Sequence, residues 1–295
     1  MRRWYVIAAP YLWLLLFFLV PFVIVFKISL SDIATAIPPY TPTLDLPAGW
    51  QGIKDFFSQL DFENYSFIFS DELYVGAYWS SLKIAAFATF LTLLAAYPIA
   101  YGMARAPREW QPTLMMLVIL PFWTSFLIRV YAWIGILKKE GLLNLFLMNT
   151  GLISEPLVIL NTTNAVYIGI VYSYLPFMIL PLYASLEKIK PSLIEAAEDL
   201  GSPPWKAFWQ VTFPLSAPGV VAGCLLVFIP AVGEFVIPDL LGGSDTLMIG
   251  KTLWNEFFNN RDWPVASAVA VILLIVLVVP IVGFQKMQEK QREAV

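Results

Sequence analysis

Six long apolar segments constrain this chain more than any other feature of its sequence. A bilayer core about 30 Å thick is crossed by a helix of roughly 20 mostly apolar residues, and each segment is long enough for that. Only 13% of the residues are charged, against roughly 25% in soluble domains. We therefore predict an all-α integral membrane protein with transmembrane helices at 4–26, 79–104, 112–137, 165–186, 215–238 and 265–284.

The basic residues predict that both termini are cytoplasmic. With six spans both ends lie on one side, and that side should carry most lysines and arginines. Arg2 and Arg3 precede the first span, but its apolar part is too long for a signal peptide, so we expect a retained anchor. The bases expected on the cytoplasmic side are Arg2, Arg3, Arg105, Arg108, Lys188, Lys190, Lys206, Lys286, Lys290 and Arg292.

The chain lacks the residues that most enzyme sites require. It has no histidine and a single cysteine, Cys224, so it forms no internal disulfide. Zinc, haem and Ser-His-Asp sites commonly need an imidazole as ligand or base. Gly250-Lys251-Thr252 resembles the end of a phosphate-binding loop, but Asp245 stands where that motif requires glycine. We predict that the chain is not an enzyme, binds no metal or cofactor itself, and has no nucleic-acid partner.

Residues 28–78 are expected to form an external loop between the first two spans. Its first half is rich in proline and its second half is aromatic and acidic. Its acids provide charge that attracts cations, although an ordinary solvated loop is the simpler interpretation. These acids are Asp32, Asp45, Asp55, Asp61, Glu63, Asp71 and Glu72.

Prolines and glycines inside the spans predict bends and close helix packing. Pro98, Pro121, Pro176, Pro181, Pro230 and Pro238 each free a backbone carbonyl, which is tolerated where a helix faces protein or a wet cavity. Gly219 and Gly223 form a small-xxx-small pattern, for which packing inside one bundle is favoured over dimerisation.

The cytoplasmic segment 190–214 reads as two short helices joined by a sharp turn. Ser192 and Glu195 have capping-box spacing, which predicts the start of the first helix. Gly201 is expected to end that helix in the left-handed conformation. Ser202 and Pro203 then supply an N-cap and a proline at the first position of the second helix.

The first of these helices has an apolar face with small residues at its centre. A helix lying on lipid is the alternative interpretation, because many short amphipathic helices between spans do this. Glu195, Glu198 and Asp199 would be repelled by an anionic leaflet, and Ala196 and Ala197 offer little area to insert. Docking to a protein is therefore the favoured interpretation.

The segment Glu195-Ala196-Ala197, then Gly201, then Val211-Thr212-Phe213-Pro214 resembles the EAA loop of binding-protein-dependent ABC importer permeases. Phe213 stands where that family usually has leucine. The resemblance implies a type I ABC importer permease architecture, in which the first loop helix is the coupling helix that docks on an ATPase. The coupling residues it implies are Glu195, Ala196, Ala197, Gly201 and Pro214.

The same resemblance implies the partners and the location. A second homologous permease, as a heterodimer, two cytoplasmic ATPase subunits and an external solute-binding protein would act with this chain in the bacterial inner membrane. ATP and Mg would be bound on the ATPase.

Segments 78–85, 233–243 and 259–268 are similar to those of putrescine transporter permeases, with spermidine/putrescine permeases close behind. The resemblance therefore implies a polyamine substrate, with putrescine as the first choice. Spermidine or another small cationic solute is the alternative. A secondary transporter driven by an ion gradient would also carry intramembrane acids and broken helices, but it needs no loop for an ATPase.

Two acids near the end of the fifth predicted span are candidate residues of a cation path. Glu234 and Asp239 are expensive there unless they face water or a cation. For Glu234 an ion pair within the bundle, for example with Arg129, remains open. Aromatic side chains that offer faces to an ammonium group complete the candidate path. These are Trp123, Tyr131, Tyr172 and Tyr174, with Trp133 nearby.

Overall fold

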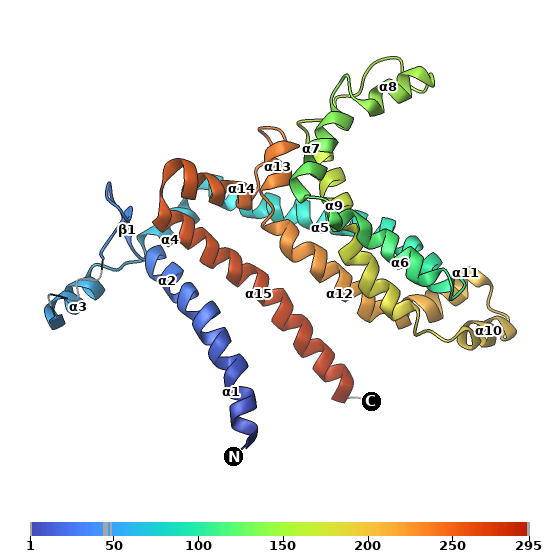
Figure 1. The fold of residues 1–295 in the computed structure, drawn as a ribbon, viewed down its shortest axis with the longest axis horizontal. Coiled ribbons are helices and arrows are strands. Elements are labelled where there is room, and N and C mark those ends of the chain that lie inside the picture. Colours follow the sequence, from blue (N-terminus) through green and yellow to red (C-terminus); the bar gives the residue numbers. More distant parts are fainter. Residues whose placement is uncertain (1, 44–46, 48, 294–295) are drawn as a thin grey trace. The chain divides into compact units, whose positions relative to one another are not determined.

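The computed structural model describes residues 2–43, 47 and 49–293, and nearly all of its regular structure is helical (Figure 1). The predicted all-α character is confirmed. Asp45 of the predicted external loop lies outside the described residues. The chain divides into two compact units, one formed by Met1–Ala77 with Thr252–Val295 and the other by Tyr78–Lys251.

The first unit is built on two long apolar helical segments, α2 and α15, which pack against each other. Most side chains of Ile7–Ser29 are exposed, as expected of a surface that meets lipid. The elements of this unit are α1 (Arg2–Leu14), the π-helical η1 (Leu15–Leu19), α2 (Val20–Ser29), β1 (Asp32–Ile33), β2 (Tyr40–Thr41), α3 (Gly49–Ser58), α4 (Glu63–Ser70), the π-helical η4 (Asn255–Asn260) and α15 (Trp263–Glu293).

The region predicted as an external loop contains ordered structure that is tied to the end of α2. β1 and β2 form a two-stranded antiparallel hairpin, in which Asp32 pairs with Thr41. The Asn64 side chain donates hydrogen bonds to the backbone oxygens of Ser29 at 3.1 Å and Ser31 at 2.8 Å. These bonds fix the start of α4 against the end of α2.

The second unit contains three long apolar helices, and α5 and α14 continue from one unit into the other. In Figure 1, α9 and α12 run side by side. The elements are α5 (Glu72–Arg105), α6 (Gln111–Ile119), the 3₁₀-helical η2 (Leu120–Trp123), α7 (Phe126–Leu137), α8 (Leu142–Asn149), α9 (Thr163–Leu186), α10 (Pro191–Asp199), α11 (Pro204–Ala207), the π-helical η3 (Phe208–Thr212), α12 (Phe213–Val232), α13 (Val236–Leu240) and α14 (Ile249–Trp254).

The core of the second unit is formed by α5, α9 and α12. Gly219 and Gly223 on α12 face α9, where a Cβ at Gly219 would lie 2.6 Å from the Pro181 backbone oxygen and one at Gly223 would lie 2.6 Å from Met178 Sδ. The two glycines therefore let α12 and α9 approach closely, and the predicted packing role within one bundle is confirmed.

Within the described residues, four helices are long and apolar enough to cross a membrane: Ile7–Ser29, Glu72–Arg105, Thr163–Leu186 and Pro204–Val232. The predicted sixth span corresponds to a shorter apolar helix, Trp263–Val279. The third predicted span, 112–137, is not one straight helix, because Gln111–Trp123 and Phe126–Asn149 are bent by 88°. Pro121 lies beside this break; its ring clashes with the preceding turn and it has no N–H to donate.

The fifth predicted span also ends earlier than expected. We predicted 215–238, whereas α12 ends at Val232 and the chain then breaks before α13. Pro238 lies inside α13. The side chain of Glu234 stabilises this break.

Candidate functional site

Glu234 lies in the break between α12 and α13, where it is 7% exposed. Its Oε1 accepts hydrogen bonds from the backbone N–H groups of Phe235 at 3.1 Å, Val236 at 3.0 Å and Ile237 at 3.4 Å. The first N–H groups of a helix have no partner within that helix. The carboxylate therefore takes the place of the missing carbonyls and starts α13.

Tyr174 on α9 donates a short hydrogen bond to Glu234 Oε2. Both oxygens of the carboxylate are thus held by donors of the same unit. A buried carboxylate in an apolar helical region is costly unless it is paired or hydrogen-bonded. Here one hydroxyl and three amides meet that requirement.

An aromatic series leads from Tyr174 to Arg129. The Tyr174 ring lies 6.1 Å from Phe177, and Phe177 lies 5.1 Å from Phe122, measured between ring centroids. The Arg129 guanidinium carbon is 5.4 Å from the Phe122 centroid and 5.8 Å from that of Phe126. This spacing is that of cation–π contacts.

Arg129 is buried, with 9% of its surface exposed. Its Nε and Nη1 atoms have no hydrogen-bond partner within the described part of the chain. The ion pair with Glu234 that the sequence left open is not formed there; the one ion pair among the described residues joins Lys251 to Asp239. Arg129 is therefore stabilised by aromatic rings and Glu234 by hydrogen-bond donors.

Glycines bring the backbone of α14 and α9 against this break. A Cβ at Gly250 would lie 2.6 Å from the Glu234 carbonyl oxygen, and one at Gly169 would lie 2.8 Å from side-chain atoms of Ile237 and Leu241. Ser81 Oγ on α5 accepts the Ile249 backbone N–H at 2.7 Å and so holds the start of α14. The sequence analysis did not identify these roles. Gly250 directly follows the apolar run Leu247-Met248-Ile249, and a glycine in that position was a usable signal of close packing.

Asp239 lies on α13 but points to the surface. Its Oδ1 is 3.3 Å from Lys251 Nζ, and the two side chains are 57% and 27% exposed, respectively. An exposed pair of this kind contributes about 0–1 kcal/mol. Asp239 and Glu234 are close in sequence but differ in environment.

The other predicted aromatic residues have separate places. Trp123 and Tyr131 are 78% and 57% exposed, whereas Tyr172 is half-buried. Tyr172 packs edge-on against Trp133, with ring centroids 5.3 Å apart. The structure thus joins Tyr174 to Glu234 and leaves Trp123 and Tyr131 on the surface.

The segment 190–214 forms a helix, a sharp turn and a second helix. Gly201 has φ +85°, as predicted for the residue that ends α10. The Ser202 N–H bonds to the Ala197 oxygen at 3.0 Å, and the Gly201 N–H bonds to the Glu198 oxygen at 2.8 Å. This pair of bonds is the Schellman motif, which satisfies the last carbonyls of a helix.

Two details of the predicted helix starts are wrong by one or two positions. α10 begins at Pro191 and has Lys190 as its N-cap, without a side-chain cap, so Ser192 does not form a capping box. α11 begins at Pro204 with Pro203 as its N-cap. In both cases a proline occupies the first helical position, where its fixed φ suits the helix and its missing N–H costs nothing.

No residue of α10 is buried in the described structure, so the whole helix is available on the surface. Leu193 and Leu200 are 47% and 88% exposed, and Glu195 and Ala196 are exposed beside a half-buried Ala197. A short helix with defined ends and an uncovered apolar face is the kind of element that docks into a partner groove.

The far end of this segment is anchored to α5. Tyr97 packs against Phe208 at 5.5 Å and Phe213 at 6.0 Å between ring centroids, and its hydroxyl lies 2.9 Å from Ser216 Oγ. Pro214 is exposed at the second position of α12. This segment is therefore packed against α5 through aromatic side chains and joined by a hydroxyl contact to α12.

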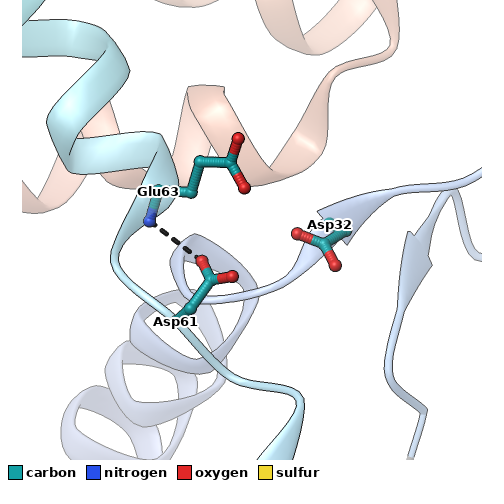
Figure 2. A group of neighbouring side chains, drawn as sticks. All are labelled: Asp32, Asp61 and Glu63. Carbon is teal, nitrogen blue, oxygen red and sulfur yellow. Dashed lines mark hydrogen bonds between the residues drawn. The ribbon is translucent and has the colours of Figure 1, made fainter.

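A cluster of acids lies in the first unit. Carboxylate oxygens of Asp32, Asp61 and Glu63 lie within 4.8 Å of one another, and all three residues are exposed (Figure 2). Asp61 Oδ1 accepts the Glu63 backbone N–H at 2.9 Å, which places it at the start of α4. This bond to the amide two residues along the chain is an Asx-turn, which accounts for the position of Asp61, so the solvated-loop interpretation is retained.

A protein-family model describes residues 96–292 as a binding-protein-dependent transport system inner membrane component. The chain is 40% identical over 271 residues to the spermidine/putrescine transport system permease protein PotB of Haemophilus influenzae, covering 92% of this chain and 88% of that protein. It is 44% identical to PotB of Escherichia coli over 207 residues, covering 70% of this chain and 75% of that protein.

A solved structure shares the fold. It is a crystal structure of a bacterial ABC transporter involved in the import of the acidic polysaccharide alginate. The match has a TM-score of 0.66 at 17% identity and covers 98% of this chain and 96% of that one.

Proposed function

Because the chain belongs to the family of binding-protein-dependent transport system inner membrane components, we propose that it is a permease subunit of a polyamine importer, with putrescine as the preferred solute. The relatives at 40% and 44% identity are named as spermidine/putrescine permeases, which supports a polyamine. Putrescine rather than spermidine rests on the three sequence segments described above.

In this proposal α10 is the coupling helix, and its exposure is the observation that carries the proposal. Glu195, Ala196 and Ala197 form the surface that enters an ATPase groove, and Gly201 holds the turn behind it. Pro214 marks the point where the loop joins α12. Closure of two ATPase subunits around ATP and Mg would shift α10 as a rigid lever, which acts on α5 through Tyr97.

The complex would also contain a second, different permease and an external solute-binding protein. Both termini of this chain would face the cytoplasm. The chain supplies no ATP chemistry itself, and it receives energy as a bias between two conformations.

For the solute path we propose that Trp123, Tyr131, Tyr172 and Asp239 contact the passing cation. Trp123 and Tyr131 offer exposed aromatic faces, and the exposed Asp239 forms an ion pair with the half-buried Lys251. An ammonium group stacks on such faces by cation–π attraction. Glu234 and Tyr174 hold the break beneath the path, because both carboxylate oxygens of Glu234 are already bonded within the unit.

The test is uptake of labelled putrescine and spermidine into membrane vesicles that contain this chain, its partner permease, the ATPase and the binding protein. We expect uptake that requires ATP and is faster for putrescine. Uptake driven by an ion gradient without the ATPase would overturn the importer assignment. ATP-dependent uptake in which spermidine is preferred would keep the importer and reject the choice of putrescine.

Asp239→Asn tests the solute path, with Asp245→Asn as its control. Asp245 is an acid on the same side of the proposed topology that the path does not use. We expect a higher concentration of putrescine for half-maximal uptake in Asp239→Asn only. Equal curves for the two variants would remove Asp239 from the path.

A further inference from the structure

A cavity of about 820 Å³ lies where four helix ends of the second unit meet. The end of α5, the start of α6, the end of α9 and the start of α10 contribute to its wall. Its polar lining consists of Arg105, Arg108, Gln111, Tyr183 and Glu187, and apolar atoms of Met115 and neighbouring residues complete it.

The polar side chains of this wall differ in whether they have hydrogen-bond partners. The Gln111 side chain donates to the Ala106 oxygen at 3.1 Å and accepts from the Tyr183 hydroxyl at 3.3 Å. Arg105 Nη2, in contrast, is buried and has no hydrogen-bond partner within the described part of the chain. An unpaired buried N–H of a charged group is costly, and the described residues offer this one no acceptor, while Arg105 itself also lines the cavity.

The charges of the lining select an anion. Arg105 and Arg108 face one acid, Glu187. The Arg105 guanidinium carbon lies 5.6 Å from the Tyr101 ring centroid, so this ring fixes one face of the guanidinium. An arginine held in this way presents its N–H groups to a phosphate in paired hydrogen bonds.

The position of the cavity relative to the membrane indicates the source of the anion. Arg105 is the last residue of α5, and α9 ends at Leu186, and both helices are apolar enough to cross a bilayer. Helix ends of this kind are expected in the zone of the lipid headgroups or just beyond it. Trp110, which is 60% exposed in the same connection, has the amphipathic ring typical of that level.

We propose that this cavity binds the headgroup of an anionic phospholipid that carries hydroxyl groups, such as phosphatidylglycerol. Arg105 and Arg108 bind the phosphate, and a headgroup hydroxyl donates to Glu187. The apolar part of the lining, including Met115, receives the glycerol backbone. Basic pockets between membrane helices bind lipid headgroups by the same chemistry.

The bound lipid would also touch the loop that is proposed to couple this chain to an ATPase. Pro191, the first residue of α10, lines the cavity together with Ile189. A headgroup in this position joins the α5–α6 connection to the start of α10. The lipid site itself does not depend on the proposed transport function.

The test is native mass spectrometry of the full-length chain in detergent, titrated with phosphatidylglycerol or with phosphatidylcholine. We expect one phosphatidylglycerol to bind selectively, and Arg105→Gln to weaken it about tenfold, as the loss of charge-assisted hydrogen bonds predicts. Arg108→Gln should weaken it less, because that residue is exposed. Lys188→Gln is the matched control: it removes one charge beside Glu187 at an exposed position outside the lining.

Circular dichroism of each variant checks that the helices are retained, and Arg108→Gln stands in if Arg105→Gln does not fold. Equal binding of the two lipids, or equal loss in Lys188→Gln and Arg105→Gln, would overturn the proposal. Displacement of the lipid by millimolar inorganic phosphate would assign the cavity to a free anion. Loss of ATPase binding in Arg105→Gln, with lipid binding unchanged, would assign Arg105 to a protein carboxylate.

Discussion

The second unit contains two breaks in apolar helices, and they are built in opposite ways. At the α12–α13 break, Glu234 accepts the first amides of α13 and the Tyr174 hydroxyl, and Gly250 packs against its backbone. At the break before α7, the side chain of the N-cap residue Ser125 does not cap the helix within the described structure. There Trp123 is 78% exposed.

The polar groups at a helix break can thus be hydrogen-bonded within one chain, or they can depend on a partner for their hydrogen bonds. At the first break both carboxylate oxygens of Glu234 are hydrogen-bonded inside the unit. At the second, Arg129 has buried N–H groups without a partner among the described residues, and large side chains are exposed. We therefore expect the α12–α13 break to be rigid in the isolated chain, and the break before α7 to acquire its remaining contacts from the permease partner or the solute.

The largest expected effect is that of Glu234→Ala. It leaves three amides and the Tyr174 hydroxyl without their acceptor, which should cost about 3 kcal/mol of the free energy of unfolding. Chemical denaturation in detergent measures it. Asp239→Ala removes an exposed acid from the neighbouring helix and should change stability by less than about 1 kcal/mol. Equal losses in the two variants would contradict the distinction between a buried and an exposed carboxylate.

Gly250→Ala should cost about 1–3 kcal/mol, because its Cβ would overlap the backbone of Gly233 and Glu234 and force it to move. Gly135→Ala provides the comparison within α7, where an added Cβ meets no atom within 4 Å. That variant should be neutral or stabilising by up to about 1 kcal/mol. Thermal unfolding of both variants in the same detergent measures these changes in stability. If Gly250→Ala is as stable as the wild type, the α12–α13 break is not tightly packed.

Arg129→Met tests the break before α7. Replacing an unpaired buried charge with an apolar side chain of similar length should leave the isolated chain unchanged or stabilise it by about 1 kcal/mol. Denaturant unfolding of the single chain gives this value. A loss comparable to that of Glu234→Ala would mean that Arg129 is already paired within the chain.

The smallest effect is expected at the start of α15, where Asp262 Oδ1 accepts the Val265 backbone N–H at 3.0 Å. Burial raises the pKa of Asp262, and the nearby Glu256 carboxylate adds to this rise. Because the folded pKa lies above the unfolded value, the folded state favours the protonated form. The contribution of Asp262 to the free energy of unfolding is therefore highest at low pH and falls as the pH rises through the folded pKa.

Asp262→Asn keeps the cap and removes the ionisation. We expect its melting temperature to change less than that of the wild type between about pH 4, near the ordinary carboxyl pKa, and pH 7. The variant should be slightly more stable at the upper end of this range. A wild type that becomes more stable than the variant as the pH rises would reverse the sign and contradict the raised pKa.

The parts of the fold that could be predicted depend on local chemistry. The apolar segments, the left-handed Gly201 and the close packing of Gly219 and Gly223 each follow from residue type and spacing. The start of α10 was predicted at Ser192 because of its capping-box spacing, but Pro191 at the first helical position decided it. Local competition of this kind shifts a boundary without changing the element.

Bends were expected at the prolines inside the spans, but which of these prolines break a helix depends on contacts between distant segments and could not be predicted. Pro121 lies beside a bend of 88°, whereas Pro176 and Pro181 remain inside α9. The three prolines have the same chemistry, so neighbouring helices determine the outcome. Likewise, Glu234 was predicted as a candidate residue of a cation path, with an ion pair to Arg129 left open, but its partners come from α9 and from neighbouring backbone amides.

The most direct test of the coupling role proposed for α10 is the amount of putrescine taken up per ATP hydrolysed, measured in vesicles with the complete transporter. Gly201→Asp is compared with Gly151→Asp. Both glycines are exposed and have positive φ, and no atom lies within 4 Å of an added Cβ. We predict that Gly201→Asp abolishes ATP-dependent uptake while Gly151→Asp preserves it. Normal uptake per ATP in Gly201→Asp would show that the turn after α10 is not needed for coupling.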